Sequence, residues 1–137
     1  MKKYKLFCTK MKIETINLYV TNMENTLSFY RALGFDIKGD QNSKSYVKIE
    51  LDSINIAFYT FDIVNSFFIE QKLSISTGNQ FNISIRKEKP EDIDEIYKNM
   101  LQTGYPPFMG PINADWNQRI IFFKDPDGNL IELCAYL

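Results

Sequence analysis

The sequence predicts an α+β fold in which a strand-helix-strand-strand-strand (βαβββ) module occurs twice. The hydrophobic period is two residues from Met11 onward, lengthens to about 3.6 residues and returns to two, and this order recurs from Gln80. The two predicted helices end at glycines, Gly34 and Gly104, which lie 70 positions apart. With 137 residues, of which 45% are hydrophobic, the chain is long enough for one domain in which both modules share a core.

The first module begins with a half-buried strand. Ile16, Leu18 and Val20 alternate there with polar or aromatic residues, which is the pattern of a strand with one buried face. Thr21 and Glu24 then have the spacing of a capping box, which predicts that a helix begins at this point.

The rest of the first module is one helix and three short strands. The expected apolar face of the helix comprises Met23, Leu27 and Tyr30. Gly34 is suited to the left-handed conformation that ends a helix. Polar turns separate strands that we expect near residues 35–39, 44–51 and 53–60.

The second module repeats the same order. A strand is expected at residues 80–86, and the run Lys89-Pro90-Glu91-Asp92 opens a helix. Proline suits a first turn that leaves its donors unpaired, and acidic side chains interact favourably with the helix dipole there. The expected apolar face of this helix comprises Ile93, Tyr97 and Met100. Strands are expected near residues 105–109, 119–124 and 129–136.

We expect one domain with four segments. These are an N-terminal extension (residues 1–10), the first module (11–60), a linker (61–78) and the second module (79–137). The opening strands align at an offset of 65 from Thr15 to Gln80, and the closing strands at 75 from Ala57 to Glu132. The offset between the two modules thus grows along the chain, from 65 through 70 to 75, which is consistent with two small insertions in the second copy.

Composition excludes several classes of function. The net charge is −1 and the basic residues form no block, so neither a nucleic-acid surface nor an anionic membrane surface is indicated. No segment approaches the roughly 20 apolar residues of a transmembrane helix, and the N-terminus is too polar for a signal core, so we expect a cytoplasmic protein. The chain contains no histidine and two cysteines, Cys8 and Cys134, which rules out a zinc site of cysteine and histidine.

Three stretches of the sequence match one superfamily. They are Asn17-Leu18-Tyr19-Val20, the run from Leu27 to Phe35 (LSFYRALGF) and the run from Asp125 to Leu133 (DPDGNLIEL), with Trp116 upstream of the last. With them the chain resembles the vicinal-oxygen-chelate superfamily, which includes glyoxalase I, extradiol dioxygenases, and bleomycin and fosfomycin resistance proteins. The resemblance implies the glyoxalase/bleomycin resistance fold, a homodimer whose paired modules form a cupped mixed sheet with a ligand cavity.

The same resemblance implies where a metal would bind. Metal-using members place two histidines and two glutamates at positions that correspond to Thr15, Ala57, Gln80 and Glu132. Only Glu132 is a metal-ligand type, and a transition metal needs several converging nitrogen, sulfur or carboxylate ligands. We therefore expect no metal and no cofactor, although magnesium could bind weakly to Glu132, Gln80 and water.

A polar and aromatic cavity face is expected from the strand alternation, because residues between the apolar ones point away from the helices. The candidate ligand-binding residues are Thr15, Asn17, Tyr19, Asn55, Tyr59, Gln80, Asn82, Arg86, Trp116 and Glu132. Tyr19, Tyr59 and Trp116 are candidates for stacking on a planar ligand, and Arg86 for binding an anion. The alternatives are a sheet face that is merely solvated, aromatic residues that belong to the core, and a solvated arginine.

Glu132 has two interpretations. It is either a polar group with a structural or ligand-pairing role, for example toward a cationic ligand, or a general base and candidate catalytic residue. The favoured function is therefore binding or sequestration of a small organic molecule. The second hypothesis is a metal-independent lyase or isomerase with Tyr19 or Tyr59 as proton partner, and the third is a sensory or accessory binding module. Cys134 is expected to be a buried, inert thiol.

Overall fold

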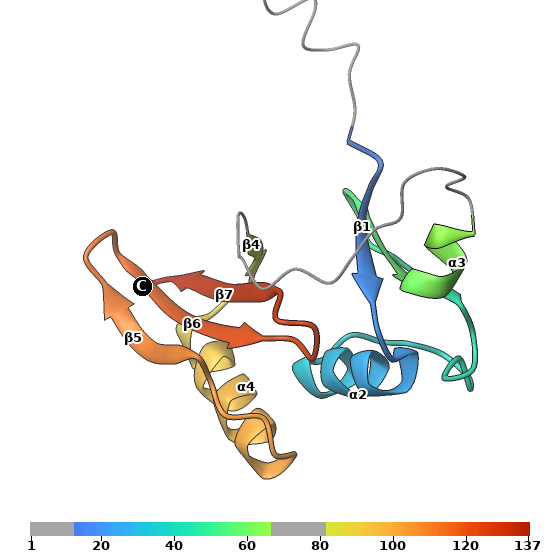
Figure 1. Ribbon diagram of the computed structural model, residues 1–137. Coiled ribbons are helices and arrows are strands. Elements are labelled where there is room, and N and C mark those ends of the chain that lie inside the picture. The colour runs from blue at the N-terminus through green and yellow to red at the C-terminus, as the bar shows by residue number, and fades with distance from the viewer. Residues whose placement is uncertain (1–12, 67–81) are drawn as a thin grey trace, which may run out of the picture.

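The computed structural model describes residues 13–66 and 82–137 (Figure 1). Along the chain, the elements are β1 (Thr15–Val20), α2 (Met23–Leu33), β2 (Tyr46–Glu50), β3 (Asn55–Thr60), α3 (Phe61–Asn65), β4 (Asn82–Arg86), α4 (Pro90–Gln102), β5 (Met109–Ala114), β6 (Gln118–Lys124) and β7 (Leu130–Tyr136). The N-terminal extension, most of the expected linker and Gln80 lie outside the described residues. Helix α3 occupies the start of that linker.

The strands form two sheets of the same plan. Sheet A has the strand order β1-β3-β2 and sheet B the order β4-β7-β6-β5. In each sheet the first strand of the module pairs in parallel with the last, and the remaining pairs are antiparallel. Helices α2 and α4 lie on the same side of the two sheets (Figure 1). The α+β fold of repeated modules is thus confirmed, with the two sheets sharing no strand pair among the described residues.

The strand predicted at residues 35–39 does not form, so that prediction is wrong. Sheet A therefore has three strands, and β2 is an edge strand. The guanidinium of Arg31 donates hydrogen bonds to two carbonyl groups of this segment, that of Ile37 at 3.3 Å and that of Gly39 at 3.0 Å. Gly39 also has a φ of 66°, which interrupts an extended backbone. The segment is therefore held by the helix instead of by β2.

The expected strand at residues 105–109 is displaced along the chain. Pro106 and Pro107 have no N–H group to donate to a neighbouring strand. Pairing begins where the Phe108 N–H donates to the Phe122 carbonyl at 2.7 Å, and β5 then runs from Met109 to Ala114. The other expected strands overlap the observed ones.

Both ends of α2 are fixed by local hydrogen bonds. The N-cap is Asn22, whose side chain accepts a hydrogen bond from the Asn25 N–H at 2.9 Å, so the capping box expected at Thr21 is wrong. At the other end, Gly34 has a φ of 116°, and its N–H donates to the Arg31 carbonyl at 3.0 Å. Asparagine, itself a strong N-cap, leaves Thr21 free to bind elsewhere.

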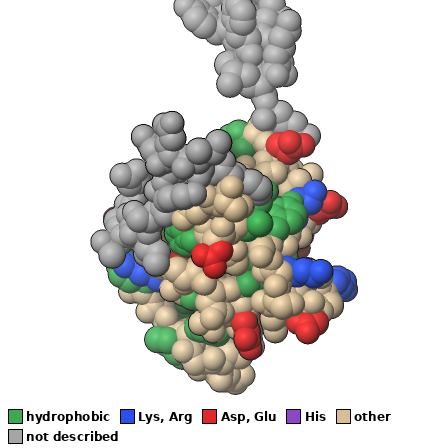
Figure 2. All heavy atoms as spheres, turned by 45° about the vertical axis from the view of Figure 1, so that its right-hand side comes forward, with side chains coloured by type: hydrophobic (Ala, Val, Ile, Leu, Met, Phe, Trp, Pro, Cys, Tyr) green, Lys and Arg blue, Asp and Glu red, His purple; other side chains and the backbone are tan. Residues whose placement is uncertain are grey.

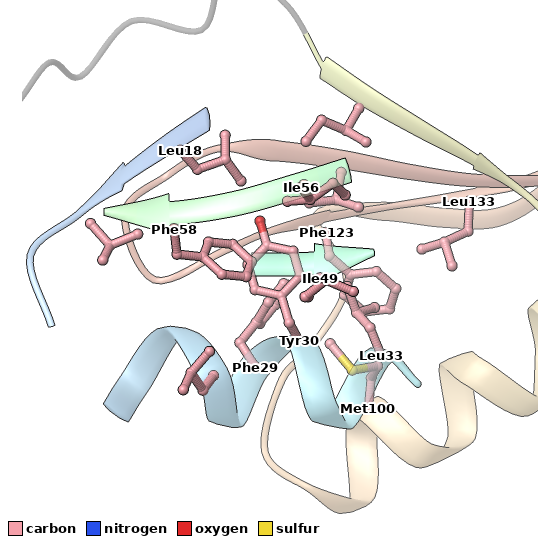
Figure 3. Close-up of a cluster of buried hydrophobic side chains, with 14 of the residues drawn as sticks. Leu18, Phe29, Tyr30, Leu33, Ile49, Ile56, Phe58, Met100, Phe123 and Leu133 are labelled. Carbon is pink, nitrogen blue, oxygen red and sulfur yellow. The ribbon is translucent and has the colours of Figure 1, made fainter. Parts of the chain in front are cut away.

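One hydrophobic core joins the modules. Figure 3 shows Leu18, Ile56 and Phe58 of sheet A, Phe123 and Leu133 of sheet B, and side chains of both long helices converging on one cluster. The expected apolar faces of both helices are confirmed, since Leu27, Tyr30, Ile93 and Met100 are buried. The helices also touch directly, and the Asn99 side chain donates to the Ala32 carbonyl at the end of α2. No helix among the described residues is long and apolar enough to cross a membrane.

The turn between β6 and β7 is held by the carboxylate of Asp125. One oxygen accepts hydrogen bonds from the N–H groups of Asp127 (3.0 Å) and Asn129 (2.8 Å). The other accepts from the Asn129 amide (2.9 Å) and the Tyr30 hydroxyl (2.8 Å). Gly128, with a φ of 86°, closes the turn by donating to the Asp125 carbonyl at 2.9 Å. Asp125 thus caps local amides and also binds the helix of the other module.

Asp127 binds the first module instead of capping the amides of its own turn. One of its oxygens accepts from the N–H and the hydroxyl of Thr21, at 3.0 and 2.8 Å. The other accepts from the hydroxyl of Thr26 at 3.4 Å. The acidic side chain therefore lies at the start of α2, where the helix dipole favours a negative charge. Both aspartates of the turn connect the second module to the first.

Burial governs the ionisation of this junction. Asp125 is 4% exposed, and the desolvation raises its pKa above the ordinary value of 3.8, although its hydrogen bonds oppose the rise. Burial, followed by the charge of Asp125, also raises the pKa of Tyr30 well above 10.0. At neutral pH the phenol is therefore a neutral donor.

We expect Tyr30→Phe to lower the free energy of unfolding by about 1–3 kcal/mol, because it leaves a buried carboxylate oxygen with one donor fewer. Urea denaturation measures this change. Tyr105→Phe is the matched control: Tyr105 packs against the same core, its ring contacts Phe29, and no hydrogen bond of its hydroxyl is described. Equal losses in the two variants would contradict the role of the Tyr30 hydroxyl.

We expect the stability difference between the unaltered chain and Asp125→Asn to fall as pH rises from below 3.8. A carboxyl with a raised pKa in the folded state keeps its proton to higher pH than in the unfolded chain. Its contribution is therefore largest below 3.8 and is lost as pH rises through the folded pKa. Denaturation of both proteins at a series of pH values measures the difference, and a difference that grows with pH would contradict the burial effect.

Candidate functional site

The candidate site residues of sheet A lie on the face turned away from the helices, here called the distal face. The parallel register of β1 and β3 places Thr15 beside Asn55, Asn17 beside Ala57 and Tyr19 beside Tyr59. The antiparallel register of β3 and β2 then adds three more residues to this face. They are Tyr46 beside Tyr59, Lys48 beside Ala57 and Glu50 beside Asn55.

Four aromatic side chains form a cluster at one end of this face. The ring centroid of Tyr59 lies 4.7 Å from that of Tyr46 and 6.5 Å from that of Tyr19. Phe61 of α3 lies 6.3 Å from Tyr19. Desolvation and then the neighbouring Tyr46 raise the pKa of Tyr59 above 10.0, so the phenol is neutral at pH 7. The cluster can stack on a ligand or donate hydrogen bonds to it.

Glu132 lies on the distal face of sheet B. The register places Ser84 beside it on β4 and Phe122 beside it on β6. The hydroxyl of Ser84 donates to the carboxylate at 2.6 Å and lies 3.7 Å from the Cys134 sulfur. Cys134 is a free and buried thiol, as expected. The carboxylate is half-buried, so it is accessible at the centre of the sheet.

Two cations flank Glu132, and each lies over an aromatic ring. The guanidinium of Arg86 lies 5.8 Å from the ring centroid of Tyr136, and the ammonium of Lys124 lies 4.6 Å from that of Phe108. Neither forms an ion pair with Glu132 among the described contacts. The distal face of sheet B therefore carries a central acidic side chain between two basic ones, and each basic side chain contacts an aromatic ring.

The remainder of this face is more apolar than the sequence predicted. Its apolar residues are Met109, Ile112, Ile120, Phe122 and Leu130. Two of them, Met109 and Ile112, are 40% and 44% exposed. The expectation of a polar face is right for β4 but wrong for β5 and β6, because the long apolar run of β6 has no alternation from which a face could be assigned.

The structure gathers most of the predicted site residues into two groups. Thr15, Asn17, Tyr19, Asn55 and Tyr59 lie on sheet A, and Asn82, Arg86 and Glu132 lie on sheet B. Trp116, 62% exposed, lies in the turn between β5 and β6, which is at the opposite end of the molecule from β1 and β3 (Figure 1). Within one chain, Trp116 and the two tyrosines are thus not brought together.

Sequence reasoning missed several neighbours of these residues. Tyr46 and Lys48 belong to the distal face of sheet A, and the alternation of exposed and buried residues in Tyr46–Glu50 was the signal for them. Phe122 lies beside Glu132, and only the strand register identifies it.

The donor set does not fit a transition metal. Of the four positions implied by the resemblance, Ala57 offers a methyl group, Thr15 a hydroxyl, and Gln80 lies outside the described residues. In residues 13–66 and 82–137, no three side chains of the histidine, cysteine, aspartate or glutamate type converge. Glu132 has a serine as its hydrogen-bond partner instead. We derive no reaction step through a metal.

Two hollows on the described surface lie apart from Glu132 and from the aromatic cluster. One of about 300 Å³ lies between α2 and α4, lined in part by Leu33, Ile96 and Lys87, and one of about 230 Å³ lies beside β2. Neither is lined by a predicted site residue. Figure 2 shows acidic and basic side chains interspersed over the face in view, with no extended patch of one sign.

Comparison with known proteins agrees with the fold. The family model described as Glyoxalase/Bleomycin resistance protein/Dioxygenase superfamily matches residues 12–133. A solved structure described as a glyoxalase/bleomycin resistance protein/dioxygenase from Nocardioides is 19% identical and has a TM-score of 0.73, with 100% of this chain and 94% of that chain covered.

Two curated relatives are also similar along most of their length. The uncharacterized protein YraH of Bacillus subtilis is 27% identical over 129 residues, which cover 93% of this chain and all of that protein. The virulence protein STM3117 of Salmonella typhimurium is 28% identical over 135 residues, which cover 92% of this chain and 85% of that protein.

Proposed function

The chain belongs to the Glyoxalase/Bleomycin resistance protein/Dioxygenase superfamily, and on this premise we propose that it binds and sequesters a small organic molecule without a metal. The observation that carries the proposal is the distal face of sheet B. There, the half-buried Glu132 lies beside Phe122 of β6, and the exposed Met109 of β5 lies beside Phe122 in turn. A few placed polar groups within an apolar surface are typical of sites for organic ligands.

The geometry favours binding over acid-base catalysis. A general base must lie within about 3 Å of the proton that it removes, and its proton partner must reach the same substrate. Glu132 is hydrogen-bonded within sheet B, whereas Tyr19 and Tyr59 belong to sheet A. The raised pKa of Tyr59 also makes its phenol a weaker proton donor. A metal-independent lyase or isomerase is therefore the less favoured function.

The proposal includes a homodimer in the cytoplasm. Trp116, Tyr136 and Leu137 are exposed near the β5–β6 hairpin, and Ile112 is exposed on the adjoining strand. Contiguous exposed apolar groups of this kind are commonly covered by another protein surface. The free thiol of Cys134 is compatible with a reducing compartment.

We expect a thermal-shift screen of metabolites and bleomycin-like drugs to yield a ligand whose affinity, measured by calorimetry, falls about 10- to 100-fold in Glu132→Gln, because the variant loses a charge-assisted hydrogen bond. Glu50→Gln is the matched control, since Glu50 is paired with Lys48 on the other sheet. If the unaltered chain converts the ligand to a product and Glu132→Gln abolishes this turnover, the protein is an enzyme instead. A saturable shift with divalent metals, lost in the same variant, would contradict the metal-free site.

We expect light scattering to give a mass of twice 16.1 kDa, and Ile112→Asp to shift it toward the monomer, because a buried charge disfavours the interface. Leu101→Asp is the control: this exposed leucine lies on α4, which packs on the opposite face of sheet B from Ile112. A monomeric unaltered chain, or dissociation by both variants alike, would contradict the proposed interface.

A further inference from the structure

An acidic and a basic side chain lie near each other on β4 and β7 without pairing. The parallel register puts Ser84 beside Glu132 and Arg86 beside Cys134, so Glu132 and Arg86 are diagonal neighbours on one face. Strands about 4.8 Å apart, with a rise of about 3.3 Å per residue, place such neighbours about 8 Å apart at the backbone. Long side chains at this separation can reach each other.

Each of the two charges is held by a different neighbour. Glu132 accepts the short hydrogen bond from Ser84, and Arg86 lies over the ring of Tyr136. The ion pairs of the described residues join other side chains, Lys38 to Asp36, Lys48 to Glu50 and Arg119 to Asp94. The β4–β7 surface therefore presents one negative and one positive group, both available to a third molecule.

We propose that this surface binds a zwitterionic ligand, an α-amino acid with an apolar side chain or a compound with the same pair of charges. The ammonium group binds Glu132, and the carboxylate binds Arg86. This inference rests on the proposed binding function and names its ligand class. A ligand with only one charge would leave the other protein charge partly desolvated and unpaired, which costs free energy.

Arg86 is better suited than Lys124 to hold the carboxylate. A guanidinium binds a carboxylate through two parallel hydrogen bonds, whereas an ammonium acts as a point charge. Lys124 is also held closer to its ring, at 4.6 Å compared with 5.8 Å for Arg86. It lies beside Leu130, on the other side of Glu132 from Arg86. Lys124 is thus the matched control for a cation on the same face.

The proposed ligand has an apolar side chain because the protein residues beside the two charges are apolar. Phe122 is paired with Glu132, and Ile120 is paired with Cys134, so the strand next to the charges is apolar. Met109, paired with Phe122, extends this surface to β5. An aliphatic or aromatic side chain placed here would cover exposed apolar area, which favours binding.

The test is a set of four probes with one benzyl body: L-phenylalanine, its amide, phenethylamine and 3-phenylpropionate. Calorimetry is expected to show L-phenylalanine binding at least about tenfold more tightly than each singly charged probe, as one charge-assisted pair predicts. Glu132→Gln should remove its advantage over 3-phenylpropionate. Arg86→Gln should remove its advantage over the amide and phenethylamine. Lys124→Gln should preserve both advantages, and melting temperatures establish that each variant is folded.

Equal affinity for all four probes, or no binding of any probe at millimolar concentration, would overturn the zwitterion assignment. Loss of the carboxylate preference in Lys124→Gln instead of Arg86→Gln would overturn the role of Arg86. These failures are distinguishable from failure of the proposed function. If the broader screen yields another ligand that depends on Glu132, the binding function stands and only the ligand class is wrong.

Discussion

The carboxylate of Asp125 is the interaction on which the rest of the structure depends. It is buried, and it accepts hydrogen bonds from two backbone N–H groups of its own turn, from Asn129 and from Tyr30 of the first module. A buried carboxylate is costly unless its oxygens are satisfied, so its four donors must stay together. One acid thereby fixes both the shape of a turn and the position of α2 against it.

This constraint reaches the candidate site through the register of β7. The turn ends where the Asp125 N–H donates to the Asn129 carbonyl, and β7 begins at the next residue. From there, the alternation of the strand places Ile131 and Leu133 in the core and Glu132 on the distal face. A shift of one residue would bury the carboxylate and expose two core side chains. The position of Glu132 thus follows from a structural aspartate seven residues earlier.

Local patterns in the sequence were sufficient to predict most of the fold. The apolar spacing in α2 and α4 predicts helices with one buried face. The alternation in β1 and β4 predicts strands with one buried face. What failed depended on side-chain partners that hydrophobic periodicity does not reveal: Thr21 binds the distant Asp127 instead of capping α2, and residues 35–39 bind the nearby Arg31 instead of β2. In the candidate site, Glu132 and the face of β4 were predictable. Its neighbour Phe122 was not, because β6 is apolar on both faces.

Loss of the histidines changes what the scaffold can recognise without changing how it folds. Of the positions implied for metal ligands, Thr15, Ala57 and Glu132 lie on the strand faces turned away from the helices, so the turn of Asp125 does not depend on which side chain stands there. With Glu132 the only carboxylate among them, the charge of the site comes from protein side chains that can each bind a ligand group directly. For the proposed ligand, recognition then depends on the strand register. The hydroxyl of Ser84 holds Glu132, and the ring of Tyr136 holds Arg86, so the two charged side chains do not pair with each other. In the proposed function, such a face discriminates ligands by the placement of their charges.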